Sequence, residues 1–226
     1  MQSFRLGAVL CAAGRSTRMG GTDKIEYQLG GKPVYAWAAE QLLAYPATMQ
    51  LVIAVSAEKA AAFVAAFAQN PRVTICVGGA SRQETVEKAV ACLKDVDLIA
   101  IHDGARPFVR AELIDAVAKV AWEVGGAIPA MPVTDTIHVA LDGMALSTPD
   151  RSTLYAAQTP QIFRTEILHD VLERVRNEGL RVTDDCSAAV ACGYPCRMVE
   201  GDAENIKITA ATDLARAEQI AATFSA

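Results

Sequence analysis

The sequence lacks the features that mark membrane, exported or nucleic-acid-binding proteins. Lysine and arginine number 21 against 26 aspartates and glutamates, and the net charge of −5 argues against a general affinity for nucleic acid or membrane surfaces. No apolar run approaches the roughly 18 residues that a membrane helix needs. The apolar run at residues 6–13 follows a single arginine and is too short for an export signal. Any site for an anionic ligand must therefore be built locally.

Cysteine and histidine patterns that carry chemistry are also missing. The six cysteines form no C-x-x-C pair and have no spacing typical of a zinc site. Free thiols in a reducing cytoplasm are the simplest interpretation, and Cys11 and Cys76 lie in apolar runs typical of buried strands. There is no G-x-S-x-G motif, and none of the three histidines has a serine or cysteine partner in a recognisable motif. Nucleophilic hydrolysis is therefore disfavoured.

What is present is an alternation of apolar runs and helical segments. We expect strands at 6–13, 50–55, 73–77, 98–102 and 126–131, and helices at 33–44, 58–69, 81–93 and 111–124. This alternation predicts a Rossmann-like α/β fold, in which a mostly parallel twisted sheet has helices on both faces. Ligands of such sheets bind at the carboxyl ends of the strands.

The pattern changes after Val133. Thr136–Leu141 alternates between the two faces of a strand and Asp142-Gly143 is a hairpin turn signal, so we expect an extended arm at about residues 133–163. An isolated arm cannot bury its apolar residues, and we expect it to pack on a second subunit. Beyond it we expect helices at 167–176, 185–192 and 213–223, a strand at 197–200 and a loop at 202–207. We therefore expect a single domain over residues 1–226 with one protruding arm.

The most distinctive stretch follows the first strand. Residues 14–24 hold three glycines together with Arg15, Arg18 and Lys24. Glycine lets the backbone approach a ligand closely and the basic residues supply charge, a combination that suits a polyphosphate. Lys24 is followed by isoleucine and Gly14 does not begin a G-x-G-x-x-G pattern, so neither common phosphate motif is present. A surface loop with solvated basic residues is the alternative interpretation.

Two more predicted strand ends, at residues 78–82 and 103–106, carry glycine and charge. Asp103 follows an apolar strand and precedes a glycine, a favourable place for a Mg²⁺ ligand, although it could instead cap a helix or pair with Arg106. Asp184 and Asp185 precede a helix and are more typical of a cap than of a metal pair. Basic residues around a metal and a triphosphate indicate phosphoryl or nucleotidyl transfer.

Several motifs occur together in an order that resembles one enzyme family. They are Ala12-Ala13-Gly14-x-x-x-Arg18-Met19, Lys24, His102-Asp103-Gly104-Ala105-Arg106-Pro107, Pro132-Val133-x-Asp135-Thr136, Thr159-Pro160-Gln161, Thr183-Asp184-Asp185 and Asn205-Ile206-Lys207-Ile208-Thr209. The pattern is similar to that of the 2-C-methyl-D-erythritol 4-phosphate cytidylyltransferases of the non-mevalonate isoprenoid pathway. The resemblance implies a cytoplasmic homodimer with a nucleotide-diphospho-sugar transferase-like fold. It also implies transfer of CMP from CTP, with Mg²⁺ or another divalent cation, to 2-C-methyl-D-erythritol 4-phosphate.

The same resemblance implies roles for individual residues. The catalytic residues would be Arg18, Lys24 and Lys207, with Arg151 from the arm. CTP would contact Ala12, Ala13, Gly14, Arg15, Ser16, Gly79, Ala80, Arg82, Thr85, Asp103 and Gly104, and Asp103 would also hold the metal. The acceptor would contact Arg106, Thr136, Arg151, Thr159, Thr183 and Lys207, with Arg151, Thr159 and Thr183 reaching it across a dimer interface.

Two alternatives stay open at this point. Ribitol-5-phosphate cytidylyltransferases share the loop and much of the fold, so the acceptor is assigned by resemblance alone. A regulatory nucleotide-binding protein without catalysis is the second alternative, although such a protein would not need the complete set of charged residues. Some relatives carry a fused cyclase domain, and we expect none in this chain.

Overall fold

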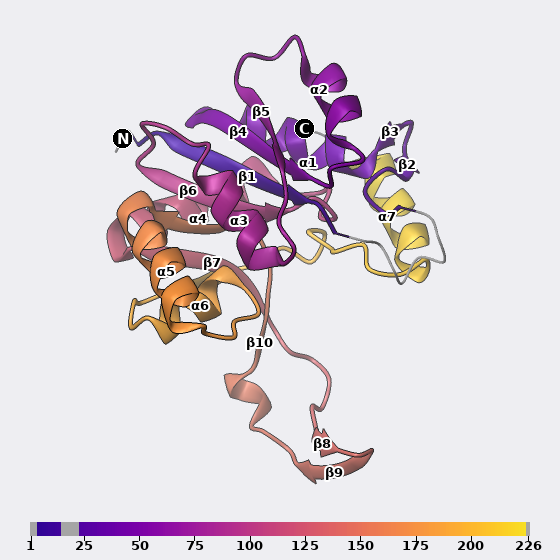
Figure 1. Cartoon of the computed structure of the whole chain (residues 1–226). Helices are drawn as coiled ribbons and strands as arrows, with labels where there is room; N and C mark the ends of the chain where they lie inside the picture. The colour runs from indigo at the N-terminus through magenta and orange to yellow at the C-terminus, as the bar shows by residue number, and fades with distance from the viewer. Residues whose placement is uncertain (1–3, 15–22, 225–226) are drawn as a thin grey trace.

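The computed structural model describes residues 4–14 and 23–224 (Figure 1). Within these ranges eight strands form one sheet with the order β10-β7-β11-β6-β1-β4-β5, and β12 also pairs with β7. The strands are β1 (Leu6–Ala12), β4 (Thr48–Val55), β5 (Val73–Val77), β6 (Leu98–Asp103), β7 (Gly126–Pro132), β10 (Tyr155–Ala157), β11 (Gln161–Arg164) and β12 (Arg197–Glu200).

The sheet is mostly parallel, which confirms the predicted fold class. β5, β4, β1 and β6 run parallel to one another, and β12 runs parallel to β7. Only β10 and β11 run against their neighbours. The register places Ala12 of β1 beside Val55 of β4, and Cys11 beside Asp103 of β6. The carboxyl ends of these strands therefore lie at one edge of the sheet.

Helices cover both faces of the sheet because its central strands are apolar on both sides (Figure 1). One face packs against α1 (Val34–Ala44), α2 (Ala60–Phe67) and α4 (Ala111–Val124). The other packs against α3 (Arg82–Val90), α5 (Thr165–Glu178) and α6 (Asp185–Ala191). A third cluster joins α7 (Thr212–Thr223) to a small hairpin of β2 (Gln28–Leu29) and β3 (Lys32–Pro33), which the sequence analysis did not anticipate.

Local sequence signals explain where two helices near the sheet edge begin. The Ser81 hydroxyl accepts a hydrogen bond from the Glu84 amide at 3.1 Å, so Ser81 caps α3 at the start of the helix predicted for residues 81–93. At α6 the Asp184 carboxylate accepts from the Ser187 amide at 2.8 Å, and the Ser187 hydroxyl bonds back to Asp184. Both caps orient the loops that lead into these helices.

The arm is present but shorter than expected. β8 (Val139–Leu141) and β9 (Met144–Ser147) form its hairpin, and a 3-10 turn at Arg151–Thr153 begins the return (Figure 1). The predicted arm extended to residue 163 and so included residues 155–157 and 161–163. This part of the prediction is wrong, because these residues pair with β7 and β6 in the main sheet. Ile162 and Phe163 are buried in the hydrophobic clusters on the two faces of the sheet, and this burial explains the difference.

Among the helices of the described ranges, none combines the length and the apolar composition that crossing a bilayer requires.

Candidate active site

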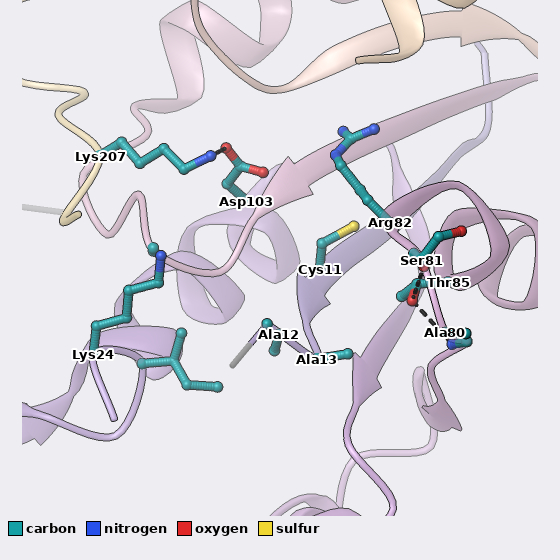
Figure 2. A pocket seen from close by; sticks show the side chains of 14 residues that line it. Cys11, Ala12, Ala13, Lys24, Ala80, Ser81, Arg82, Thr85, Asp103 and Lys207 are labelled. Carbon is teal, nitrogen blue, oxygen red and sulfur yellow. Dashed lines mark hydrogen bonds and ion pairs between the residues drawn. The ribbon is translucent and has the colours of Figure 1, made fainter. Parts of the chain in front are cut away.

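A cavity of about 560 Å³ opens at the carboxyl ends of β1, β5 and β6 (Figure 2). Its lining consists of strand ends and the loops that follow them. The lining residues are Cys11, Ala12, Ala13, Gly14, Lys24, Ile25, Gly79, Ala80, Ser81, Arg82, Thr85, Asp103, Ala105 and Lys207. The three predicted strand-end segments therefore meet at one place, as expected for a parallel sheet.

β1 and β6 pair closely up to the strand ends that line the cavity. The Gly104 amide donates a hydrogen bond to the Cys11 carbonyl oxygen at 2.9 Å. A Cβ at residue 104 would lie 2.9 Å from the same oxygen, so glycine is needed for this approach. Gly104 was predicted to contact CTP, and it is not among the residues that line the cavity.

One wall is a stiff loop between β5 and α3. The Thr85 hydroxyl donates to the Ser81 carbonyl oxygen at 2.8 Å and accepts from the Gly79 amide at 3.0 Å. The Glu84 carboxylate accepts from the Ala80 amide at 2.8 Å. A Cβ on Gly79 would lie only 2.4 Å from the Glu84 side chain. The loop thus presents its backbone, rather than side chains, to the cavity.

The opposite wall carries charge. Lys207 Nζ lies 2.7 Å from Asp103 Oδ2, and Lys24 lines the same side (Figure 2). Arg106 Nε lies 3.7 Å from the same carboxylate oxygen. Burial alone would raise the pKa of Asp103, but Lys207, Arg106 and Arg82 together hold it below its ordinary value. Asp103 is therefore ionised, and the wall contains this carboxylate together with Lys24 and Lys207.

Arg82 connects the cavity to α6. Its guanidinium lies 2.6 Å from the Asp185 carboxylate, whose side chain is only 5% exposed. Burial would lower the pKa of Arg82, but Asp185 more than reverses this effect, so the guanidinium stays charged. The sequence analysis treated both aspartates at this helix as caps. That interpretation is confirmed for Asp184, whereas Asp185 serves as the partner of Arg82.

A buried polar network lies beneath Asp103. The Thr159 hydroxyl accepts from the Asp103 amide at 3.1 Å and lies 2.9 Å from His102 Nδ1. His102 Nε2 lies 3.0 Å from the Arg106 carbonyl oxygen, which can only accept. Nε2 therefore carries the proton, and Nδ1 accepts from Thr159. Burial lowers the pKa of His102 to about 4, so the imidazole is neutral.

The predicted acceptor residues are not gathered in this cavity. Arg106 is buried and donates to the carbonyl oxygens of Asn205 at 2.7 Å and Ala157 at 3.3 Å. Thr136 and Arg151 lie on the exposed arm, where Arg151 donates to a neighbouring carbonyl at 2.8 Å. Thr183 is exposed beside the start of α6. Only Lys207 of the acceptor set lines the cavity.

Other predicted residues fall into two groups. Of the nucleotide set, Ala12, Ala13, Gly14, Gly79, Ala80, Arg82, Thr85 and Asp103 all line the cavity. Arg15, Ser16 and Arg18 lie outside the described residues. No group of three or more histidine, cysteine, aspartate or glutamate side chains that could hold a metal is found in the described ranges. Asp103 is thus the predicted metal ligand that the structure brings to the cavity.

Sequence analysis missed one polar side chain at the centre of the site. Cys11 was assigned to the core, but its thiol lines the cavity between Arg82 and Asp103 (Figure 2). Burial raises the pKa of this thiol to about 12, so it stays protonated. Cys11 is one of the last residues of β1 before Gly14, and this position was a signal that its side chain could reach the cavity.

Comparison with known proteins points to one family. The family model described as 2-C-methyl-D-erythritol 4-phosphate cytidylyltransferase matches residues 6–223. The enzyme of that name from Caldanaerobacter subterraneus is 37% identical over 222 residues, which cover 95% of this chain and 98% of the relative. A bifunctional enzyme IspD/IspF from Desulforudis audaxviator is 39% identical over 219 residues, and the match spans 94% of this chain but 56% of that relative.

Solved structures agree with the sequence relatives. The crystal structure of 2-C-methyl-D-erythritol 4-phosphate cytidylyltransferase from Thermus thermophilus is 30% identical, with a TM-score of 0.78. The match covers 95% of this chain and 98% of that one. Because both the family model and the relatives extend over nearly the whole chain, the chain belongs to the 2-C-methyl-D-erythritol 4-phosphate cytidylyltransferase family.

Proposed function

We propose that the cavity binds CTP and transfers its CMP group to the phosphate of 2-C-methyl-D-erythritol 4-phosphate. Membership of the family makes the chain a cytidylyltransferase of isoprenoid biosynthesis. We place the reaction in this cavity because its two walls differ in chemical character. Backbone from Gly79 and Ala80 forms one wall, and Lys24, Lys207 and Asp103 form the other. A base fits the first wall and a triphosphate fits the second.

The backbone wall favours cytosine over uracil. The amides of Gly79 and Ala80 are already bonded to Thr85 and Glu84, so their donors are engaged. Recognition of the base at this wall then falls to carbonyl oxygens, which accept from the exocyclic amine of cytosine. Uracil has a carbonyl oxygen at that position, and two facing acceptors repel each other. CTP should therefore bind more tightly than UTP.

The charged wall stabilises the transition state. Attack of one phosphate on the α-phosphorus of CTP brings negative charge onto oxygens that pyrophosphate then carries away. Lys24 and Lys207 supply positive charge at this wall without needing a dedicated base, because the attacking phosphate is already ionised. Arg18, which lies outside the described residues, is proposed to act with them.

A divalent cation such as Mg²⁺ fits beside Asp103. This carboxylate is ionised and lies among the strand-end residues, but it is the only carboxylate among the described lining residues. Mg²⁺ commonly takes one or two protein carboxylates and completes its shell with phosphate and water oxygens. When bound, the ion would neutralise charge on the triphosphate. The chain's own part is to keep Asp103 ionised, which its three cationic neighbours do.

The arm is proposed to complete the acceptor site of a second subunit. Five apolar side chains between residues 137 and 146 are each 40–70% exposed, namely Ile137, Val139, Leu141, Met144 and Leu146. An apolar surface of this kind on a two-stranded arm is stabilised when another chain covers it. In such a homodimer Thr136 and Arg151 would reach a partner's cavity.

We also propose a cytoplasmic location. The six cysteines are all free thiols, which accords with a reducing compartment.

Release of pyrophosphate tests the function and its main alternative together. The chain is incubated with CTP and Mg²⁺, and either 2-C-methyl-D-erythritol 4-phosphate or ribitol 5-phosphate is added. We expect rapid release with the first acceptor and at least a hundredfold lower kcat/KM with the second. Preference for ribitol 5-phosphate would overturn the proposed acceptor. CTP binding without release from either acceptor would instead favour a regulatory nucleotide-binding protein.

A further inference from the structure

Lys59, the residue that precedes α2, lies against the turn that carries Lys24. Its ammonium group forms a salt bridge with Asp23 and lies 3.0 Å from Glu26 Oε2. The two acidic residues stand on either side of Lys24 in the sequence, and Asp23 is 36 residues away from Lys59 along the chain. The side chain of Lys59 is 20% exposed, so the contact is largely shielded from water. It links the second helix to the cavity wall.

The turn is built around Asp23. Its carbonyl oxygen accepts from the amides of Glu26 and Tyr27, each at 3.1 Å. Its carboxylate accepts from the Ile25 amide at 3.1 Å while also binding Lys59. One carboxylate therefore closes the turn locally and anchors it at a distance. Lys24 lies inside this closed turn.

The turn is also fixed to the start of α1. The carbonyl oxygen of Ile25 accepts from the Tyr35 amide, and that of Tyr27 accepts from the Val34 amide, both at 3.0 Å. These are amides of the first helical turn, which have no partner inside the helix. Ile25 is 3% exposed and packs in the core below α1. Hydrogen bonds from α1 therefore fix one side of the turn, and the salt bridge from Lys59 fixes the other side.

Charge gives the contact a second consequence. Lys59 offsets the charge of Asp23 and Glu26, the two acidic residues that flank Lys24 in the sequence. Burial alone would lower the pKa of Lys59, but Asp23 and Glu26 more than reverse this effect, so the amine stays charged. The ammonium group therefore stays paired with both carboxylates, and these ion pairs keep the turn anchored.

We propose that Lys59 is a positioning residue for Lys24, holding the turn of residues 23–27 so that the Lys24 amine is fixed in the cavity. The inference rests on the proposed function, because it requires Lys24 to act on the transition state. Catalytic groups tolerate little displacement, and a shift of about 1 Å can cost about 100-fold in rate. A salt bridge that only stabilised the fold would change the melting temperature without a specific effect on turnover.

Substitution of Lys59 by methionine and by arginine tests the proposal. We expect Lys59→Met to lower kcat about 10- to 100-fold while the KM for CTP changes less than threefold. Lys59→Arg keeps the charge and should retain kcat within about threefold of wild type, on the same reasoning that position decides rate. Hydrogen exchange gives a readout besides activity. The amides of residues 25–27 should exchange faster in Lys59→Met, while those of β1 and β6 stay unchanged.

Matched variants separate this proposal from other causes of lost activity. Lys119→Met removes another lysine ion pair, with Asp115 on α4, and should leave kcat unchanged. Asp23→Asn keeps an acceptor for the Ile25 amide but removes charge, so it tests the contact even if Lys59→Met fails to fold. Normal kcat in Lys59→Met or, where that variant does not fold, in Asp23→Asn would overturn the proposal. So would a loss of kcat with unchanged exchange at residues 25–27.

Parallel assays of wild type and Lys24→Ala distinguish failure of this proposal from failure of the proposed function. An active wild type, a Lys24→Ala variant with strongly reduced kcat and a normal Lys59→Met would overturn only the positioning role. A Lys24→Ala variant as active as wild type would overturn the proposed catalytic assignment, and the positioning role with it.

Discussion

Replacing Lys207 with methionine separates its contribution to catalysis from its contribution to stability. The Lys207 amine lies 2.7 Å from Asp103 Oδ2. This distance is shorter than the 3.7 Å between Arg106 Nε and the same oxygen. After the change, Arg106 at 3.7 Å is the remaining basic residue within salt-bridge distance of Asp103 among the described residues. Methionine preserves most of the side-chain length but removes the charge. The carboxylate, whose side chain is 15% exposed, then loses its shortest ion pair.

The expected sizes of the two effects differ. Because Lys207 is 39% exposed, the ion pair itself stabilises the fold by about 1 kcal/mol at most. Leaving the buried carboxylate less well bonded adds about 1 kcal/mol, so the variant should lose about 2 kcal/mol. For a chain of this size that corresponds to a fall in Tm of about 4–8 °C. Loss of a charge that stabilises the transition state should lower kcat about 100- to 1,000-fold, or about 2.7–4 kcal/mol.

Calorimetry and steady-state kinetics on the same preparation measure both effects. At an assay temperature well below the Tm, the stability loss leaves the enzyme folded, so the fall in kcat reports on catalysis. Lys207→Arg should recover part of the rate, because a guanidinium restores positive charge at a different distance. A fall in kcat of less than threefold in Lys207→Met would refute the placement of Lys207 at the reacting phosphate. A Tm loss large enough to unfold the variant under assay conditions would instead refute the stability estimate of about 2 kcal/mol.

Three further predictions follow from other parts of the site. Lys24→Ala should lower kcat about 100-fold with little change in the Kd for CTP, measured by calorimetric titration, and near-normal kcat would contradict its role. Gly79→Ala places a Cβ 2.4 Å from the Glu84 side chain, so the loop between β5 and α3 must move. We expect this movement to weaken CTP binding about tenfold. An unchanged affinity for CTP would argue against a nucleotide at this wall. His102 has a pKa of about 4 in the fold against an ordinary value of 6.5, so the unfolded chain binds more protons between these pH values. The stability that neutral His102 provides is present above pH 6.5 and lost towards pH 4, by about 3 kcal/mol. Denaturant titrations of His102→Gln should show a weaker pH dependence over this range, and an identical dependence would contradict the role of burial.

Much of the fold could be predicted because the central strands are covered on both faces. In the sequence such strands are continuous apolar runs. Glycines at Gly14 and Gly78 and the charged residue Asp103 indicate where these runs end. Since parallel strands end at one edge, convergence of these segments followed from the fold class. The cap of α3 at Ser81 was likewise predictable from local sequence, because a capping serine acts over only three residues.

The parts that were not predicted depend on contacts between distant segments. A short break that contains Pro160 separates β10 from β11, so the two segments look like a continuation of the arm. Only their pairing with β6 and β7 shows that they belong to the sheet. The partners Arg82 and Asp185 are 103 residues apart, so no local pattern connects them. Roles of the arm residues Thr136 and Arg151 were assigned by resemblance, and neither residue lines the cavity at the strand ends.

The central claim is that this cavity moves the CMP group of CTP onto the phosphate of 2-C-methyl-D-erythritol 4-phosphate. A single-turnover experiment with CTP labelled at the α-phosphate, excess wild-type chain, Mg²⁺ and the acceptor tests it most directly. The account predicts that the label appears in 4-diphosphocytidyl-2-C-methyl-D-erythritol, and that Lys24→Ala and Lys207→Met transfer it about 100-fold or more slowly than the wild type does. Label that remains in CTP with the wild type, or that appears in free CMP, would contradict the account.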